Sequence, residues 1–272
     1  MADGISPHIK RWITGVIAVP LLLLIIISGG EALFAVVIGA LILVGVHEYN
    51  ALVFDESFAW EKREGLIIAL FMSLAVYFGD PALVLAVVIF SVIAAFILHL
   101  LRIKEQALDI TPVAKVVLGF VYIPLAMSHF ILIRRFEEGV LWVFFVLVLA
   151  FAGDTAAFYV GRTWGKRKLL PAVSPGKTAE GILGLIGGSI LACALYQQIL
   201  LPQLPLFHAV ILGFVGSILG QLGDLCESLI KRASGVKDSG VILPGHGGIL
   251  DRLDCLLFIA PFVYYYYAFI IK

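Results

Sequence analysis

Charged residues are scarce in this sequence. Asp, Glu, Lys and Arg together make up 14% of the 272 residues, whereas they make up about a quarter of a typical soluble domain. The few charges are bunched into short segments between long apolar runs, so we expect no soluble domain. The formal net charge is zero. Bulk charge therefore points to no partner, and we expect no nucleic acid among the partners.

Cysteine is almost absent as well. The sequence has Cys193, Cys226 and Cys255, which form no C-x-x-C pair and each lie in or beside an apolar stretch. This scatter argues against a disulfide framework and against a zinc site. We therefore interpret the three cysteines as small buried residues.

Three further patterns are missing. No internal repeat at a fixed period is visible, which argues against the inverted-repeat architecture of many transporters. The GxxxxGK[ST] spacing of a P-loop does not occur. The first apolar run resembles a signal peptide, but it is long and more apolar runs follow, so we interpret it as a retained first helix.

Apolar residues are what the sequence has in excess, at 61% of the chain with a mean hydropathy of +1.07. A helix of about 20 apolar residues crosses the hydrocarbon core of a bilayer. The apolar runs therefore predict an all-α, polytopic integral membrane protein with about nine transmembrane helices in a single membrane-embedded domain over residues 1–272. The expected spans are residues 12–28, 33–53, 66–79, 81–101, 112–133, 140–160, 181–201, 205–229 and 252–271, and the third ends in a tight turn at Gly79-Asp80-Pro81.

The positive-inside rule orients these spans. With the N-terminus in the cytoplasm, every Lys and Arg except Arg134, Arg135 and Lys272 lies on the cytoplasmic side. We therefore expect a multi-pass protein of the cell membrane, with the loops at residues 161–180 and 230–251 in the cytoplasm and the C-terminus outside. Loops of this length are often functional.

Glycines recur at three- and four-residue spacing in residues 181–188 and 213–223. Such strips of bare backbone let helices approach closely. We interpret them as helix packing, not ligand binding, and they favour a homodimer.

The polar stretch that follows residue 223 has the strongest chemical pattern. If the helices extend into it, two sets of polar side chains share helical faces. These sets are Asp224, Glu227, Ser228 and Lys231 at the end of one helix, and Asp251 and Asp254 at the start of the next. Mg²⁺ prefers one or two carboxylates together with phosphate oxygens and water, so the two helix ends fit a metal–triphosphate complex.

Basic residues and glycines lie between these acids. Four basic residues can supply positive charge for phosphate groups: Lys231, Arg232, Lys237 and Arg252. Three glycines allow the backbone to approach an anion closely: Gly245, Gly247 and Gly248. A solvated interfacial loop with snorkelling Lys and Arg would explain the basic residues. It would not explain acids at the ends of membrane helices, which are costly unless they are used.

The loop at residues 161–180 has a weaker pattern. Asp154 lies inside the preceding apolar helix, where an unpaired carboxylate is expensive, so we expect it to have a partner. The run from Ser174 to Glu180 resembles a capped helix start with Lys177 and hydroxyl groups beside it. Taken alone, this loop is only moderately specific for phosphate.

The run from Ser228 to Asp254 reads S-x-x-K-R-x4-K-D-x-G-x3-P-G-H-G-G-x-x-D-R-x-D. This pattern resembles the signature of the phosphatidate cytidylyltransferase family, also called CDP-diacylglycerol synthases. The runs at residues 153–155 and 174–181 resemble that family too, so the likeness is strong over residues 150–272, which are expected to carry the nucleotide and metal site. Glu48 resembles a family acid only weakly.

The resemblance implies a reaction in which CTP and phosphatidic acid give CDP-diacylglycerol and pyrophosphate, for phospholipid biosynthesis, and it too favours a homodimer. A phosphate oxygen of the lipid is already a competent nucleophile. Catalysis should therefore be mainly positioning and charge neutralisation around the α-phosphorus of CTP, without a covalent intermediate or a dedicated general base.

Roles for individual residues follow from the spacing and the resemblance together. The expected Mg²⁺ ligands are Asp224, Asp251 and Asp254, and a second cation is left open. The expected catalytic residues are Asp224, Lys231, Lys237, Asp238, His246, Asp251 and Arg252. The expected substrate-binding residues are Asp154, Ser174, Lys177, Thr178, Glu180, Ser228, Arg232, Gly247 and Gly248. His246 is either a general acid or a hydrogen-bonding loop residue, and Asp238 either pairs with Lys237 or joins the metal shell.

Three other functions compete with this hypothesis. A transporter or channel would place charges near the middle of several spans, whereas here Asp154 and Glu48 are the main exceptions to charges at helix ends. A CDP-alcohol phosphotransferase would show a DG-x2-AR pattern, which does not occur. A CTP-dependent lipid kinase is the nearer rival.

Overall fold

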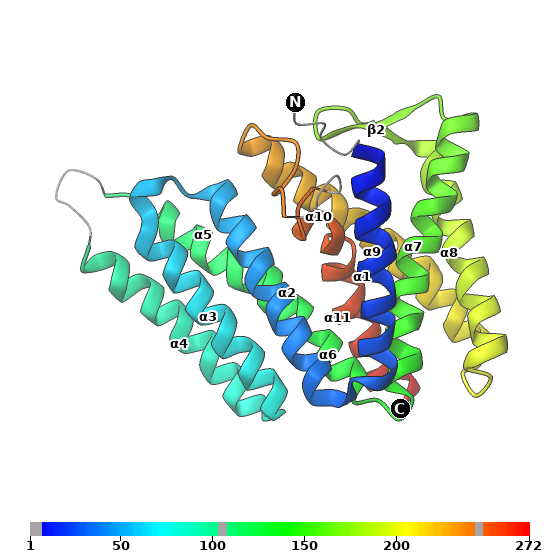
Figure 1. The fold of residues 1–272 in the computed structure, drawn as a ribbon, viewed down its shortest axis with the longest axis horizontal. Coiled ribbons are helices and arrows are strands. Elements are labelled where there is room, and N and C mark those ends of the chain that lie inside the picture. The colour runs from blue at the N-terminus through cyan, green and yellow to red at the C-terminus, as the bar shows by residue number, and fades with distance from the viewer. Residues whose placement is uncertain (1–6, 103–107, 243–246) are drawn as a thin grey trace. The chain divides into compact units, whose positions relative to one another are not determined.

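The computed structural model describes residues 7–102, 108–242 and 247–272 (Figure 1). These residues are helical almost throughout, which confirms the predicted all-α class. Within these ranges the β-structure is one antiparallel hairpin of β1 (Lys168–Leu170) and β2 (Ser174–Thr178), which the sequence did not predict. Three- and five-residue strands are too short to show an alternating pattern, and Pro175 and Gly176 disfavour a strand.

The chain divides into two compact units. The first comprises Met1–Leu132 and Asp238–Arg252, and the second comprises Ile133–Lys237 and Leu253–Lys272. The single membrane-embedded domain over residues 1–272 stays a prediction.

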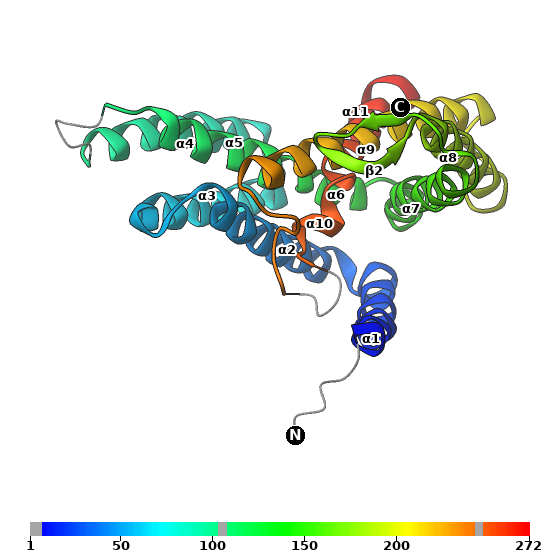
Figure 2. The ribbon, with the colours of Figure 1, turned by 90° about the horizontal axis from the view of Figure 1, so that it is seen from above.

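The first unit is built from long helices and short turns. Its elements are α1 (Pro7–Ser28), α2 (Gly30–Val53), η1 (Glu56–Phe58), α3 (Ala59–Phe78), α4 (Pro81–Leu100), α5 (Thr111–Phe120) and the π-helical η2 (Val121–Leu125), with α6 (His129–Arg134) and α10 (Leu250–Leu253) at its boundaries. The helices α3 and α4 lie side by side (Figures 1 and 2). Between them, Gly79 adopts a φ of 75° and the Asp80 carboxylate accepts a hydrogen bond from the Ala82 N–H at 2.8 Å. This confirms the predicted tight turn.

Helix α2 is packed against α3, α5 and η2. Two hydrogen bonds fix its C-terminal end: the Tyr49 hydroxyl donates to the Lys115 carbonyl at 2.9 Å, and the Lys115 ammonium donates to the Val53 carbonyl at 2.6 Å. The buried side chains around it include Phe34, Ile42, Met72, Phe120 and Ile123. The end of α2 is therefore held rigidly, and Glu48 lies in this last part.

The second unit is a group of antiparallel helices that carries the hairpin at one end (Figure 1). Its elements are α7 (Gly139–Trp164), β1, β2, α8 (Ala179–Leu200), α9 (Leu206–Ala233), α11 (Leu256–Tyr266) and the π-helical η3 (Tyr267–Ile271). Gly184 on α8 faces α7 so closely that an added Cβ would lie 2.6 Å from the Val160 Cβ, and a Cβ on Gly213 of α9 would lie 2.9 Å from the Ile190 Cα. These contacts confirm the prediction of helix packing. They lie within one chain, so the homodimer stays a prediction.

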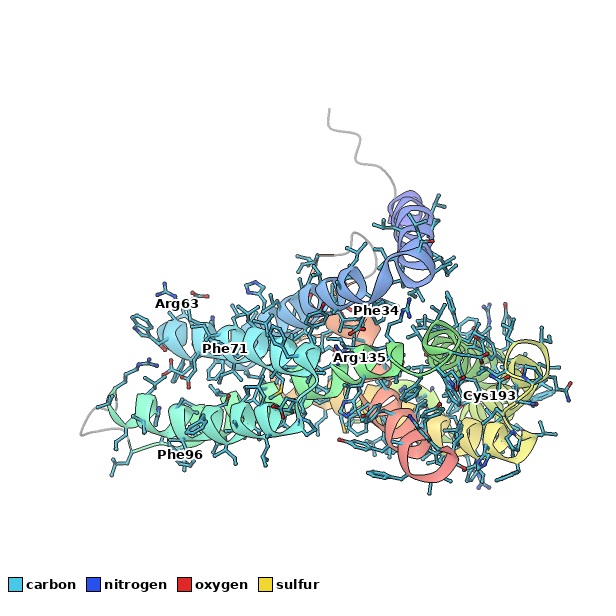
Figure 3. The ribbon with its side chains drawn as sticks, turned by 90° about the horizontal axis from the view of Figure 1, so that it is seen from below. Phe34, Arg63, Phe71, Phe96, Arg135 and Cys193 are labelled. Carbon is cyan, nitrogen blue, oxygen red and sulfur yellow. The ribbon has the colours of Figure 1, made fainter. Side chains whose placement is uncertain are left out.

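The cysteines are buried at two of three positions. Cys193 lies inside the second unit (Figure 3), and Cys255 is also buried. Cys226 is exposed, so its predicted burial is wrong. It shares a face of α9 with Leu222 and Leu229, which are exposed as well, whereas α9 buries the neighbouring face that carries Gly223.

Seven helices of the described residues are long and apolar enough to cross a membrane. Each of the predicted spans is helical in the structure. The first and third predicted spans fall outside the seven. The described apolar part of α1 is the short stretch Val19–Ser28, and α3 begins with the charged residues 61–64. The chain is a polytopic membrane protein, and the exact count of nine stays a prediction.

Candidate functional site

A cavity of about 350 Å³ with several charged side chains in its lining lies in the second unit. It is lined by α7, the end of β2, the start of α8 and the C-terminal half of α9. The polar residues of its lining are Asp154, Arg162, Lys177, Thr178, Gln221 and Asp224. Four of these six were predicted as site residues, although they come from segments up to 70 residues apart.

An ion pair joins two walls of the cavity. The Lys177 Nζ lies 2.5 Å from the Asp224 Oδ2, and both side chains are partly exposed, at 21% and 31%. Asp154 and Asp254 each interact electrostatically with both members of this pair. The charge of Asp224 opposes ionisation of Asp154 and that of Lys177 favours it, so the predicted partner of Asp154 stays a prediction. Three carboxylates close to one ammonium leave an excess of negative charge, which favours a cation in the neighbourhood.

The start of α8 is held by its own side chains. Thr178 is the N-cap residue, and its Oγ1 accepts a hydrogen bond from the Gly181 N–H at 3.1 Å. The Glu180 carboxylate accepts hydrogen bonds from the backbone N–H groups of Lys166 at 3.0 Å and Arg167 at 3.2 Å. The predicted helix start is confirmed at Thr178. Glu180, expected to bind substrate, is placed to hold the loop that precedes the hairpin.

Arg232 contacts the tip of the hairpin. Its Nε donates to the Val173 carbonyl at 3.2 Å, and its Nη1 donates to the Val236 carbonyl at 2.9 Å. Ser174, which follows Val173, lies in β2 and is partly buried. Arg232 therefore links the hairpin to the segment that follows α9, in addition to any contact with a substrate.

The end of α9 presents the polar face that the sequence predicted. The Ser228 hydroxyl donates to the Asp224 Oδ1 at 3.3 Å, and the Lys231 Nζ lies 2.5 Å from the Glu227 carboxylate, whose side chain is fully buried. Lys231 was expected to act in catalysis. Its ammonium neutralises a buried acid, and it is not part of the cavity lining.

A second set of predicted residues lies in the first unit. The Asp251 Oδ2 accepts hydrogen bonds from the Ser239 N–H at 2.9 Å, the Ser239 hydroxyl at 3.0 Å and the Gly248 N–H at 2.8 Å. Gly247 has a φ of +81°, a backbone conformation that favours glycine. Backbone donors thus gather around the Asp251 carboxylate, whereas the expected approach of the loop glycines to phosphate stays a prediction.

The predicted helical face shared by Asp251 and Asp254 is wrong. Helix α10 ends at Leu253, and Asp254 and Cys255 form a turn before α11 begins at Leu256. The Asp254 carboxylate accepts a hydrogen bond from the Cys255 N–H at 2.7 Å, a local bond that competes with helix continuation. Asp251 belongs to the first unit, and Asp254 to the second with Asp224.

Four predicted site residues are named neither in the cavity lining nor in the hydrogen bonds of the Asp251 carboxylate described above: Lys237, Asp238, His246 and Arg252. Lys237, Asp238 and Arg252 are exposed. His246 lies outside the described residues. Within the described part of the chain, no group of three or more His, Cys, Asp or Glu side chains is placed to hold a metal ion. The Mg²⁺ site of Asp224, Asp251 and Asp254 stays a prediction.

Three residues in these clusters were missed by the sequence interpretation: Arg162 and Gln221 in the cavity lining, and Ser239 beside Asp251. Gln221 lines the cavity three residues before Asp224, and the helical spacing alone could have placed it on the same face. Ser239 contacts Asp251 and also the Glu48 carboxylate, at 3.0 Å. A serine in a glycine-rich loop gives no such signal in the sequence.

Comparison with known proteins places these residues in a family. The model of the family described as "Cytidylyltransferase family" matches residues 9–270. A protein of Bacillus subtilis named phosphatidate cytidylyltransferase is 42% identical over 154 residues, which are 56% of this chain and 57% of that protein. A protein of Staphylococcus epidermidis with the same name is 41% identical over 58% of this chain and 57% of its own length. These matches span less than two thirds of the relatives.

A longer match covers nearly all of the chain. The Staphylococcus aureus protein named phosphatidate cytidylyltransferase is 30% identical over 262 residues, which are 92% of this chain and 95% of that protein. The family match includes both the cavity of the second unit and the Asp251 loop. The chain belongs to the cytidylyltransferase family.

Proposed function

We propose that this protein transfers a cytidylyl group from CTP to phosphatidic acid, giving CDP-diacylglycerol and pyrophosphate for phospholipid biosynthesis. The observation that carries the proposal is the cavity in which Lys177 and Asp224 form an ion pair beside Asp154, at one end of membrane-spanning helices. A cavity that has charged side chains in its lining and lies at a helix end suits a lipid phosphate meeting a water-soluble nucleotide. The name shared by the relatives agrees with this chemistry.

The residues present fit a divalent cation. Asp154, Asp224 and Asp254 interact with one another and with Lys177, and Mg²⁺ needs only one or two carboxylates when phosphate oxygens supply further ligands. Asp224 and Asp254, with Asp251 of the first unit, are the proposed ligands. When bound, Mg²⁺ would neutralise negative charge on the departing pyrophosphate.

The chain's own residues would bind and orient the phosphates. An oxygen of the lipid phosphate attacks the α-phosphorus of CTP, and the new P–O bond forms as the bond from that phosphorus to the bridging oxygen of the β-phosphate breaks. Pyrophosphate leaves with that electron pair. Lys177 is placed to exchange its contact with Asp224 for a phosphate oxygen, and the Thr178 hydroxyl lines the same wall.

Labelled CTP tests the proposal against the lipid-kinase alternative. The purified protein in detergent would be given phosphatidic acid and Mg²⁺ with CTP labelled at either the α- or the γ-phosphate. We expect the α-label in the lipid product and the γ-label in pyrophosphate. A γ-label in the lipid would replace this proposal by a kinase reaction, and no label in lipid from either CTP would reject both.

Three further proposals concern the setting of the reaction. We place the protein in the bacterial plasma membrane, with the cavity on the cytoplasmic side where CTP is available. A homodimer and a second cation are proposed with it. The molar mass of the detergent-solubilised protein, measured by light scattering, tests the homodimer.

A further inference from the structure

Glu48 is a buried acid on α2 that the proposed reaction leaves without a role. Its side chain is 2% exposed, and it accepts hydrogen bonds from two backbone N–H groups of the segment at residues 238–252. The Ser239 hydroxyl, which has one proton, lies within hydrogen-bond distance of this carboxylate and of the Asp251 carboxylate. The Ile249 N–H donates to its Oε1 at 2.9 Å, the Leu250 N–H donates to its Oε2 at 2.8 Å, and the Ser239 hydroxyl lies 3.0 Å from the same Oε2. All of these residues belong to the first unit.

The same serine connects Glu48 to Asp251. The Ser239 Oγ lies 3.0 Å from the Asp251 Oδ2, and the Asp251 N–H donates back to that Oγ at 3.3 Å. The Glu48 carboxylate thus fixes both ends of the loop: Ser239 at its start, and the residues before Asp251 at its end. An acid 203 residues away in the sequence is separated from the Asp251 carboxylate by one hydroxyl group.

The backbone approaches Glu48 too closely for side chains. A Cβ on Gly240 would lie 2.5 Å from the Glu48 Oε1, and a Cβ on Gly248 would meet both Ser239 and Glu48. A glycine at each position lets the loop close around the carboxylate. The arrangement therefore depends on a carboxylate at residue 48 and on bare backbone on both sides of it.

We propose that Glu48 is a positioning residue that holds Ser239 and residues 248–250 in the conformation that presents Asp251. This inference rests on the proposed function, in which Asp251 is a Mg²⁺ ligand. Groups that orient a metal ligand through hydrogen bonds change metal affinity or activity by about 10–100-fold when they are removed. Glu48 acts through Ser239 and backbone N–H groups.

The variant Glu48→Gln tests the charge and the acceptors while keeping the size. Both carboxylate oxygens accept hydrogen bonds, whereas an amide has one acceptor and would turn an NH₂ group toward a backbone N–H. We expect a rise of about tenfold or more in the Mg²⁺ concentration for half-maximal activity. Glu56→Gln is the matched control, because that acid is fully exposed and pairs only with Lys62 at 3.5 Å among the described contacts.

Limited trypsin digestion gives a readout that does not depend on activity. Lys237 directly precedes the segment and is exposed, so a loosened segment should be cut faster after Lys237 in Glu48→Gln than in the wild type or in Glu56→Gln. The new N-terminus at Asp238 identifies the cut by mass spectrometry. Wild-type cleavage and a wild-type Mg²⁺ dependence in Glu48→Gln would overturn the proposal.

The variant Ser239→Ala tests the connection itself. Because Ser239 transmits the effect, the double variant Glu48→Gln/Ser239→Ala should be less impaired than the product of the two single effects. Fully multiplicative effects would contradict transmission through Ser239. If Glu48→Gln does not yield monodisperse protein, Ser239→Ala is judged by the same cleavage and Mg²⁺ criteria.

Failure of the positioning role of Glu48 can be distinguished from failure of the proposed function by comparing Glu48→Gln with Asp251→Asn. If Asp251→Asn keeps wild-type activity, the assignment of Asp251 as a ligand fails. Faster cleavage after Lys237 in Glu48→Gln would still support the structural part of the inference in that case. If Asp251→Asn is inactive but Glu48→Gln is unchanged in both readouts, the proposed function stands and the positioning role falls.

Discussion

At the scale of single residues, the ion pair of Lys177 and Asp224 is unusual for its place. It lines a cavity among apolar helices, where even partial removal of both charges from water is costly and mutual attraction repays this cost only with good geometry. The 2.5 Å separation supplies the geometry, yet Asp154 and Asp254 add repulsion nearby. A stability role alone explains the pair poorly, whereas a role in binding charged ligands explains all four residues.

The first prediction is that Asp224→Asn and Asp251→Asn each lose nearly all activity. Asparagine keeps the size and polarity but removes the charge that a cation needs. A loss of ~3 kcal/mol in transition-state stabilisation corresponds to roughly a hundredfold in rate. The measurement is the rate of CDP-diacylglycerol formation at saturating substrates, with size-exclusion profiles to confirm folding.

The controls for this prediction are Arg135→Gln and Lys272→Gln, in which a charge distant from the cavity lining is removed. They should keep activity within about twofold, because exposed charges far from the chemistry contribute little. Full activity of Asp251→Asn at saturating Mg²⁺, together with inactive Arg135→Gln, would place the catalytic site elsewhere.

The acidic residues that lie in apolar helices could be identified as site candidates from the sequence, but the residues that they contact could not. Asp154 and Asp224 stand out because carboxylates are costly in membrane helices, and the structure brings both to the same cavity. The bond between Glu48 and Ser239 joins residues 191 positions apart, so no local pattern could indicate it. The turn at Asp254 was missed because a side-chain hydrogen bond to the next N–H overrides helical spacing.

At the scale of elements, the start of α8 shows how the cavity wall is built. Thr178 ends β2 and caps α8, so one residue serves both the hairpin and the helix. Its side chain also lies close to Gly161 of α7, where an added Cβ would be 3.1 Å from the Thr178 Oγ1. The cap therefore sets the distance between the hairpin, α7 and α8.

The second prediction is that Thr178→Val lowers thermal stability. Valine keeps the shape but removes the oxygen that accepts the Gly181 N–H, and loss of an N-cap costs about 1 kcal/mol. The midpoint of thermal unfolding in detergent should fall by roughly 2–4 °C. Thr163→Val, in which an exposed hydroxyl bonds only the carbonyls of its own helix, should shift the midpoint by less than half as much. Equal shifts would reject the capping role.

The third prediction compares two glycines of α8. Alanine favours helix by about 1 kcal/mol over glycine at either position. A Cβ at Gly184 would lie 2.6 Å from the Val160 Cβ, whereas a Cβ at Gly187 meets nothing within 4 Å. Gly184→Ala should therefore unfold at a lower temperature than the wild type, and Gly187→Ala at the same or a higher one. Unfolding of both at the wild-type temperature would show that α7 and α8 are not in close contact.

The helices were predictable because each apolar run is longer than a strand and is bounded by charge, glycine or proline. The boundary at Gly79 was clear for this reason. The ordered hairpin at residues 168–178 was not, since its strands are fixed by contacts from outside: the Arg232 side chain at the tip and the Glu180 carboxylate at the base. Such contacts leave no periodic trace in the sequence.

At the scale of the whole molecule, the segment at residues 238–252 belongs to the same unit as the N-terminal helices, although it lies near the other end of the sequence. The sequence predicted that residues 150–272 carry the site, yet this segment belongs to the first unit and is bonded to α2 through Glu48. The N-terminal half is therefore more than a membrane anchor, because it supplies the acid that holds Asp251 and its loop.

The fourth prediction concerns the orientation of the chain in the membrane. The concentration of Lys and Arg in alternate segments predicts that the hairpin loop faces the cytoplasm and that Lys272 faces outward. In a Cys226→Ser background, which removes the exposed native thiol, a cysteine added after Lys272 should react with an impermeant thiol reagent in intact cells. A Lys168→Cys variant should react only after the cells are opened. Each span between residue 168 and the C-terminus moves the chain to the other side of the membrane. Labelling of both positions only after opening would therefore exclude an odd number of spans after the hairpin. Labelling of Lys168→Cys in intact cells would instead place the hairpin and its cavity outside, where CTP is not available, and would reject the cytoplasmic site.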